Sequence, residues 1–163
     1  QFGADYVVLS LQWGNEYQHD PSSFQLELAE ELLNDPNIDI IVGSHAHVIQ
    51  PIGTVNDKPV IYGLGNFLSN QSFNCCPDAS QNGVIVFVEI EGQRGEVHIT
   101  KNISVTPTRV DRSNYKIIPL FDEIMSLEVG SYFRNIYERA FNETMTVLEQ
   151  LGGKFALEVK ETN

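Results

Sequence analysis

A strand–helix–strand pattern in the first 42 residues is the feature that most constrains the fold. Residues 6–11 (Tyr-Val-Val-Leu-Ser-Leu) and 38–42 (Ile-Asp-Ile-Ile-Val) are short, apolar and rich in β-branched side chains, as expected of strands covered on both faces. Between them, residues 20–22 (Asp-Pro-Ser) begin a helix whose apolar residues recur at helical spacing. Short connections in such a unit place the two strands parallel in one sheet. The sequence therefore predicts a fold of the α/β class.

The rest of the chain is predicted to add strands and then helices. Four further strands are expected, in two pairs that each surround a turn: 52–55 with 60–62, and 84–90 with 97–105. From residue 119 the apolar residues recur at helical spacing, and Gly130 is expected to divide this region into two helices.

The charge of the chain is strongly negative, with 22 acidic and 10 basic residues and a net charge of −12. Residues 1–70 carry nine acidic residues and one basic residue, Lys58. Such a surface repels nucleic acid and anionic lipid, because phosphate contacts need clustered Lys and Arg. It is either a well-solvated acidic surface or one that attracts cations. No apolar run approaches the ~20 residues that span a bilayer, and the start at Gln1 suggests that an upstream segment has been removed.

The two cysteines, Cys75 and Cys76, are neighbours in the sequence. A bond between adjacent residues closes a strained ring, and the pair lacks the spacing of a zinc site. We therefore predict two unpaired thiols in a loop.

Three clusters of polar and small residues follow predicted strands, at 11–17, 43–47 and 62–67. In open α/β sheets, ligands bind at the carboxyl ends of the strands. These three segments are therefore the candidate site.

His45 and His47 are the strongest candidates for chemistry. Two residues apart on extended backbone, both rings project to one side, and neutral imidazole is a common ligand of transition metals. The alternative is a pair of hydrogen-bonded loop histidines. Two ligands do not complete a site, because a catalytic zinc takes about three protein ligands and a two-metal centre takes more.

The other candidates have equally plain structural alternatives. Asn66, with the glycines before it, could hold a tight turn near a ligand or a turn with no ligand. Trp13 could pack against a sugar or peptide, or belong to the core. Glu16 could act as an acid or base, or be an exposed loop carboxylate.

Four ordered blocks of this sequence resemble the bacterial capsule-synthesis (CapA, poly-γ-glutamate) family of the calcineurin-like metallophosphoesterase superfamily. The blocks are residues 7–17, 21–29, 41–51 and 58–67. The resemblance is dense over residues 4–70, looser to about residue 112, and absent from 113 onward.

The resemblance implies a fold of two mixed β-sheets packed face to face with helices outside. On that basis, residues 1–112 are expected to form the C-terminal half of such a domain, followed by a mostly helical tail at 113–163.

The resemblance also implies roles for individual residues. His45 and His47 match two metal ligands of the superfamily, whereas Gln12 stands where the superfamily carries a ligand histidine. Trp13, Glu16 and Asn66 would line the same pocket. A divalent metal (Mn, Zn or Fe) is expected in the full-length domain, with weak or no binding by this chain alone, because the remaining ligands lie in earlier blocks.

The function implied is a component of capsule or poly-γ-glutamate biosynthesis or anchoring at the bacterial cell surface, with a degenerate metal site. The alternatives are a metal-dependent phosphoesterase or related hydrolase, and a non-catalytic scaffold of a membrane synthase complex. The implied partners are the missing N-terminal half of the domain, a membrane capsule-synthase complex and an anionic polymer, but no nucleic acid. Because the chain is itself acidic, contact with a polyanion would need a bridging cation or the missing half.

Overall fold

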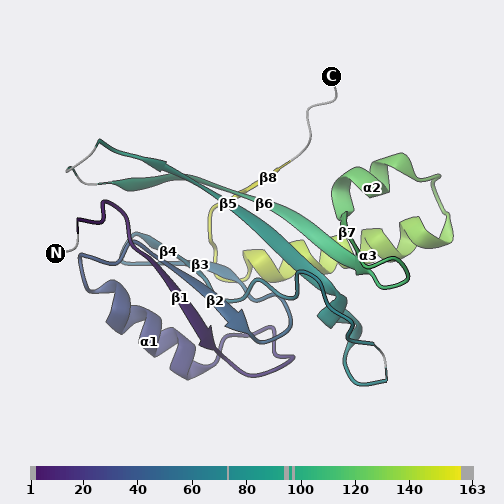
Figure 1. Ribbon diagram of the computed structural model, residues 1–163, viewed down its shortest axis with the longest axis horizontal. Coiled ribbons are helices and arrows are strands. Elements are labelled where there is room, and N and C mark those ends of the chain that lie inside the picture. The colour runs from purple at the N-terminus through teal and green to yellow at the C-terminus, as the bar shows by residue number, and fades with distance from the viewer. Residues whose placement is uncertain (1–2, 73, 94–95, 97, 159–163) are drawn as a thin grey trace.

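Two β-sheets form the centre of the computed structural model, which describes residues 3–72, 74–93, 96 and 98–158 (Figure 1). The first sheet has the order β1-β2-β4-β3 and contains β1 (Val8–Trp13), β2 (Ile40–His45), β3 (Ile52–Val55) and β4 (Lys58–Ile61). In the second sheet three strands pair with β6; its members are β5 (Asn82–Glu91), β6 (Ile99–Asp111), β7 (Lys116–Pro119) and β8 (Ala156–Leu157).

The predicted strand–helix–strand unit is confirmed. β1 and β2 are parallel and in register from Val8 opposite Ile40 to Trp13 opposite His45, and α1 (Ser23–Leu33) connects them. Both strands begin two residues later and extend further than predicted. Ser22 is the N-cap of α1, in a reciprocal capping box with Gln25. Trp13 and His45 therefore lie at the same edge of the sheet, where β1 and β2 end.

The predicted hairpin and helices are also confirmed. β5 and β6 are antiparallel and longer than expected, and β5 follows a short 3-10 helix, η1 (Asp78–Gln81). Gly130 lies between α2 (Leu120–Ser126) and α3 (Tyr132–Glu149). The sequence pattern missed β7 and β8, which are only four and two residues long. Such short strands carry too few residues for a period to be recognised.

The two sheets share one core. Ile40, Ile52 and Ile61 of the first sheet pack with Val84 and Val105 of the second, as expected for an α/β fold of two stacked sheets. A second cluster fills the space between the first sheet and α1, and a third joins α2 to α3.

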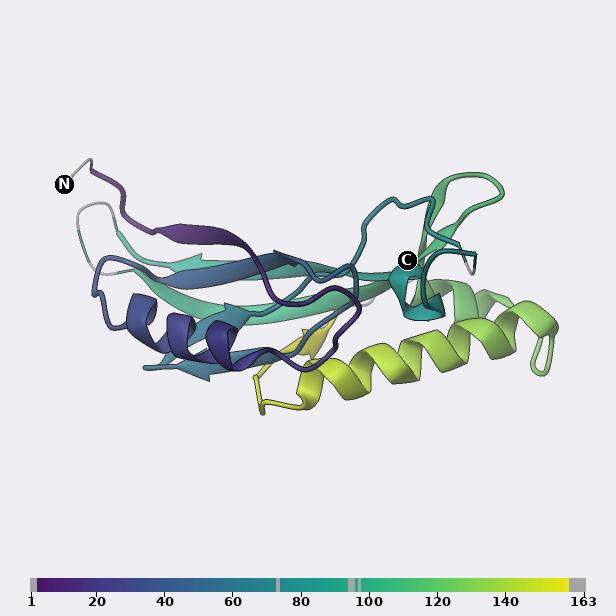
Figure 2. The ribbon, with the colours of Figure 1, turned by 90° about the horizontal axis from the view of Figure 1, so that it is seen from below.

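Helix α3 runs along the molecule from the α2 end back toward the first sheet (Figure 2). Its residues Val147 and Leu148 enter the core between the sheets, and the following chain bonds to both sheets, Gly153 N to Ile52 O and Glu158 N to Val105 O. The division of the chain at 112/113 stays a prediction.

The prediction that Cys75 and Cys76 do not pair is wrong. The two residues form a disulfide, with their Cα atoms 3.7 Å apart. The chain turns tightly here, since the backbone N–H groups of both cysteines donate to the carbonyl oxygen of Ser72, each at 2.9 Å. That turn brings two sulfurs together that an extended backbone would keep apart.

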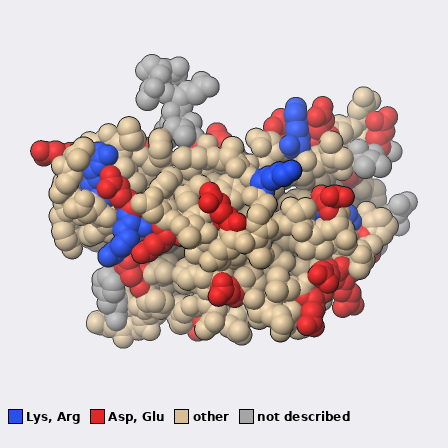
Figure 3. All heavy atoms as spheres, turned by 180° about the vertical axis from the view of Figure 1, so that it is seen from behind, with Lys and Arg blue, Asp and Glu red and all other residues tan. Residues whose placement is uncertain are grey.

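Acidic side chains are spread over the surface, and the basic side chains on the face seen in Figure 3 lie beside acidic ones. Lys101 pairs with Glu89 and Glu91, and Arg139 with Asp78 and Glu143. Within the described residues, no helix is both long and apolar enough to cross a membrane.

Candidate functional site

A glycine in β2 brings the first and third predicted clusters together. A Cβ atom on Gly43 would lie 2.0 Å from the carbonyl oxygen of Tyr62 and 2.2 Å from Nε1 of Trp13. Because glycine has no Cβ atom, Trp13 Nε1 can donate to Tyr62 O at 2.8 Å, and the rings of Trp13 and Tyr62 stack with centroids 5.7 Å apart. The carboxyl end of β1 is thereby tied to the chain that follows β4.

The two histidines lie together, but not on extended backbone as predicted. His45 ends β2 with φ of 100°, and His47 has φ of 57°. Both values fall in the left-handed region that residues with a Cβ atom rarely adopt. The bent backbone still brings the imidazole centroids to 6.2 Å. Strained backbone of this kind is found disproportionately at functional sites.

Asn66 fixes the proton of His47. Its side-chain nitrogen donates to three acceptors, the carbonyl oxygens of His47 and Ser80 and Oε1 of Gln71, at 3.3, 2.8 and 3.1 Å. This fixes the orientation of the amide, so that Oδ1 is the atom 2.9 Å from Nδ1 of His47. Nδ1 of His47 must then donate, and Nε2 keeps its lone pair. An imidazole held in this way is the usual arrangement of a metal-ligating histidine.

Gln12 lies beside His45, as predicted. Its amide nitrogen Nε2 is 3.4 Å from Nδ1 of His45. An amide nitrogen only donates, so Nδ1 accepts and the neutral ring carries its proton on Nε2. Metal binding through Nε2 of His45 would need the Gln12 amide to turn over and accept from Nδ1. With the Gln12 amide in this orientation, the neutral rings of His45 and His47 carry their protons on different nitrogens.

Tyr17 was not singled out by the sequence reasoning, although it lies in the first cluster. Its ring stacks on His47 with centroids 6.1 Å apart, and its backbone N–H donates to Ala46 O at 2.7 Å. Its hydroxyl lies 3.6 Å from Sγ of Cys76 and 3.5 Å from Nε2 of Gln71. A single half-buried tyrosine in a loop adds nothing to the hydrophobic periodicity of the sequence. Only the fold therefore reveals the contact between Tyr17 and His47.

A buried pair of amides holds the loops of the site. Gln25 and Gln50 are fully buried, and Gln25 Nε2 donates to Gln50 Oε1 at 2.8 Å. Gln50 Nε2 donates in turn to Gln18 O at 3.0 Å. The pair links α1 to the chain on both sides of the histidines. In the sequence, a glutamine on an amphipathic helix reads as a surface residue.

The remaining predicted pocket residues have three different roles. Trp13 is 5% exposed and packs in the cluster between the first sheet and α1, so it serves the core. Glu16 is exposed on the loop after β1. Asn66 lies at the site, next to Gly65, whose φ of 70° allows the turn.

The two histidines do not form a metal site by themselves. His47 offers a lone pair at Nε2, and His45 lies close enough for both rings to contact a common ion or two ions about 3.5–4 Å apart. Among the described residues, no group of three or more His, Cys, Asp or Glu is placed to hold a metal ion. The donor set fits a divalent transition metal only when further ligands are added.

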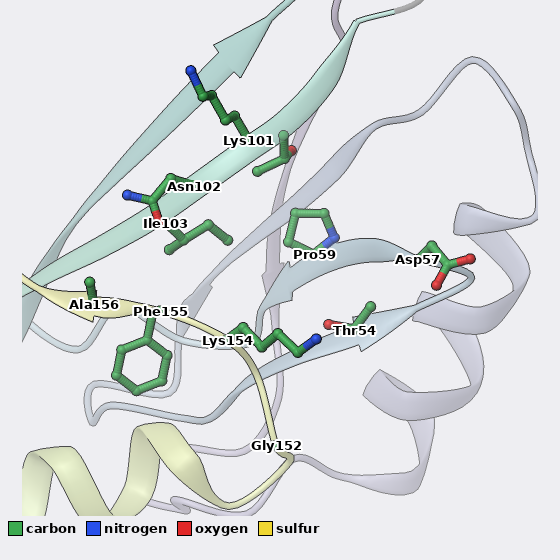
Figure 4. Close-up of a pocket in the computed structure, with 11 residues that line it drawn as sticks. Thr54, Asp57, Pro59, Lys101, Asn102, Ile103, Gly152, Lys154, Phe155 and Ala156 are labelled. Carbon is green, nitrogen blue, oxygen red and sulfur yellow. The ribbon is translucent and has the colours of Figure 1, made fainter.

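A cavity of about 660 Å³ lies elsewhere, between the β3–β4 hairpin and β6 with β8 (Figure 4). The side chain of Lys101 points away from the hairpin toward β5, and the Lys154 amine points toward Thr54. None of its lining residues belongs to the histidine cluster, by which we mean Gln12, His45, His47 and Asn66. This cavity is therefore not part of the candidate site.

Residues 1–71 match the family described as "Bacterial capsule synthesis protein PGA_cap". The chain is similar to "PGA biosynthesis protein CapA" of Bacillus subtilis (strain 168), with 42% identity over 77 residues, which are 47% of this chain and 20% of that protein. It is 39% identical to "Capsule biosynthesis protein CapA" of Bacillus anthracis over 77 residues, 47% of this chain and 18% of the relative. A "Probable polyglutamine synthesis accessory protein" of Mycobacterium tuberculosis (strain H37Rv) is 27% identical over 66 residues, 40% of this chain and 17% of the relative. The matched part thus spans about a fifth of each relative.

Proposed function

We propose that the protein is a component of capsule or poly-γ-glutamate biosynthesis, because residues 1–71 match the bacterial capsule-synthesis family. The observation that carries the proposal is that the matched segment contains the histidine cluster. It includes β1 with Gln12, β2 with His45, β4, and the loops that carry His47 and Asn66. The similarity therefore covers the histidines together with the first sheet and α1.

We propose that His45 and His47 face a divalent metal (Mn, Zn or Fe) in the complete domain. Support comes from the lone pair on Nε2 of His47 and from the ring separation of 6.2 Å. The remaining ligands would come from sequence outside the four matched blocks. A metal bound there would supply Lewis-acid chemistry toward an oxygen of the substrate. Within this chain, Asn66 orients His47, and Gln12 decides which nitrogen of His45 is available.

The setting that we propose is the cell surface, in a complex with a membrane capsule synthase and with the other half of the domain. The relatives named for PGA biosynthesis and as a polyglutamine synthesis accessory protein support a role beside a synthase. The net charge of −12 argues against direct binding of an anionic polymer by this chain. A cation at the histidine cluster, or basic residues elsewhere in the protein, would be needed for that contact.

A chimera tests the function. In B. subtilis, the 77 matched residues of the CapA relative would be replaced by those of this chain, and secreted poly-γ-glutamate would be measured in a strain that lacks the native gene. We expect the chimera to restore polymer. A chimera that is produced and folded but makes no polymer would contradict the proposal.

Two alternatives are separated by histidine variants of the same chimera. In a non-catalytic scaffold, which the amide at Gln12 favours, His45→Ala with His47→Ala would leave polymer yield unchanged. In a phosphoesterase or related hydrolase, the double variant would abolish it. For this chain alone we expect no metal-dependent turnover of a generic phosphodiester, because two imidazoles do not hold a catalytic metal.

A further inference from the structure

We propose that Tyr17 is a positioning residue for His47 and that the Cys75–Cys76 disulfide holds Tyr17 in place, so that reducing the disulfide changes the surroundings of His47. The inference rests on the proposed function only in giving His47 a role at the site. The contacts that carry it are independent of metal and polymer.

Tyr17 is attached to the His-x-His segment by its backbone and its ring. Its N–H donates to Ala46 O at 2.7 Å, between the two histidines. Its φ of 62° is in the left-handed region, so this conformation is held by its surroundings. The ring faces His47 at 6.1 Å with an angle of 30° between the planes. A movement of Tyr17 would therefore change the surroundings of the His47 ring directly.

The hydroxyl of Tyr17 contacts the loop of residues 71–76, which carries the disulfide. It donates to Cys76 Sγ at 3.6 Å and accepts from Gln71 Nε2 at 3.5 Å. Both partners lie in the segment between β4 and η1, more than 50 residues away in sequence. This one oxygen thus connects the loop after β1 to the loop that carries the disulfide.

A second connection runs from the same loop to His47 without Tyr17. Gln71 Oε1 accepts from Asn66 Nδ2 at 3.1 Å, and Asn66 Oδ1 accepts from His47 Nδ1 at 2.9 Å. Tyr17 and Asn66 therefore hold the ring of His47 from two directions, its stacked face and its Nδ1. Gln71 bonds to both of them.

The disulfide is the element that closes this loop on itself. Cys75 and Cys76 N–H groups both donate to Ser72 O, and Ser72 N–H donates back to Cys75 Sγ at 3.4 Å. With the S–S bond present, neither sulfur can rotate away, so Cys76 Sγ stays at the Tyr17 hydroxyl. Without it, each side chain regains its own rotamers.

The chemical step is a two-electron reduction by a dithiol. A thiolate of the reductant attacks one protein sulfur, breaking the S–S bond and forming a mixed disulfide; its second thiol then displaces the protein sulfur. The products are two protein thiols and the oxidised, cyclic reductant, with the two protons coming from the reductant thiols. The disulfide persists in an oxidising compartment and is removed in a reducing one.

The test follows the imidazole signals of the ¹⁵N-labelled chain by NMR, before and after dithiothreitol. Reduction is verified by thiol alkylation and mass spectrometry, and the fold by circular dichroism. In the wild-type chain, we expect the ring signals of His47 to shift while those of His98, a half-buried histidine between β5 and β6 whose Nδ1 lies 3.0 Å from Glu96 O, stay in place. The Cys75→Ser/Cys76→Ser variant should show the shifted position at once and should not respond to reductant.

Tyr17→Phe is the matched variant, because it keeps a ring against His47 and removes only the hydroxyl. We expect its His47 signals to respond to reduction much less than in the wild type. A His47 signal that does not move when the disulfide is fully reduced would overturn the proposal. An equal response in Tyr17→Phe would overturn the role of Tyr17. Neither result depends on polymer synthesis or metal binding, so the proposed function would stand or fall separately.

Discussion

The side-chain oxygen of Asn66 lies 2.9 Å from Nδ1 of His47, and this contact decides which nitrogen of His47 carries the proton. The neighbouring histidine has the opposite arrangement, since Nδ1 of His45 accepts from Gln12. Two imidazoles two residues apart are thus prepared differently by the amides beside them. The amides thereby set which nitrogen of each neutral ring is left with a lone pair.

Asn66→Ala should release His47 from its tautomer. In the neutral ring of wild-type His47 we expect the proton on Nδ1, and in the variant a shift toward the Nε2–H form that imidazole prefers in water. Long-range ¹H–¹⁵N spectra distinguish the two forms. The variant should also lose about 1–3 kcal/mol of stability, since the carbonyl oxygen of buried Ser80 and the half-buried acceptors His47 O and Gln71 Oε1 lose their donor. Asn70→Ala is the control, because Asn70 is exposed and accepts from Arg112 at the surface. An unchanged tautomer in Asn66→Ala would show that Asn66 does not orient His47.

Gln12→His should create a metal site. The new imidazole would lie beside His45, with His47 adjacent, and three imidazoles suffice for a weak zinc or nickel site. We expect zinc affinity to rise at least tenfold, about 1.4 kcal/mol, and His45→Ala to remove the gain. Calorimetric titration measures both. Ser10→His, exposed on the same strand two residues earlier, is the matched control and should bind no tighter than the parent. If the two variants behave alike, residue 12 does not share a site with the histidines.

Gly43→Ala should destabilise the fold strongly. Its Cβ would meet the Tyr62 carbonyl and Trp13 Nε1, so β2 or the chain after β4 must shift and the Trp13–Tyr62 hydrogen bond breaks. The expected loss is about 3 kcal/mol. Urea denaturation followed by fluorescence of Trp13, the single tryptophan, measures it. Gly130→Ala should cost only about 1 kcal/mol, from the left-handed backbone alone, because nothing lies within 4 Å of the added atom. Equal losses would mean that the close approach at Gly43 is not needed.

The carboxyl group of Asp111 should titrate with a pKa of about 2. Hydrogen bonds from the Ser113 side chain, the Asn114 side chain and the Ser113 backbone lower the pKa of this exposed group from its ordinary value of 3.8. A lowered folded pKa means that its stabilising effect is complete above about pH 4 and is lost as the pH falls toward 2. Asp111→Asn should therefore flatten the pH dependence of stability in that window. A carboxyl titration by NMR near pH 3.8 would contradict this.

The sequence alone determined the frame of this protein. Apolar, β-branched runs and helical spacing specify β1, α1 and β2 from local preferences, and the parallel pairing follows from the short connections. Because parallel strands end at the same edge of a sheet, the sequence also predicted that Gln12 and His45 meet there. The matched blocks placed the candidate site within residues 1–71.

Only the tertiary structure decided how that edge is built. The left-handed backbone of His45 and His47, the orientation of Asn66, the stacking of Tyr17 and the buried Gln25–Gln50 pair all depend on contacts between residues distant in the chain. The Cys75–Cys76 bond depends on a turn around Ser72 that no periodicity reveals. Periodic patterns report which face of an element is buried. They carry no information on which polar atoms from separate elements meet, because that is fixed by packing of the whole fold.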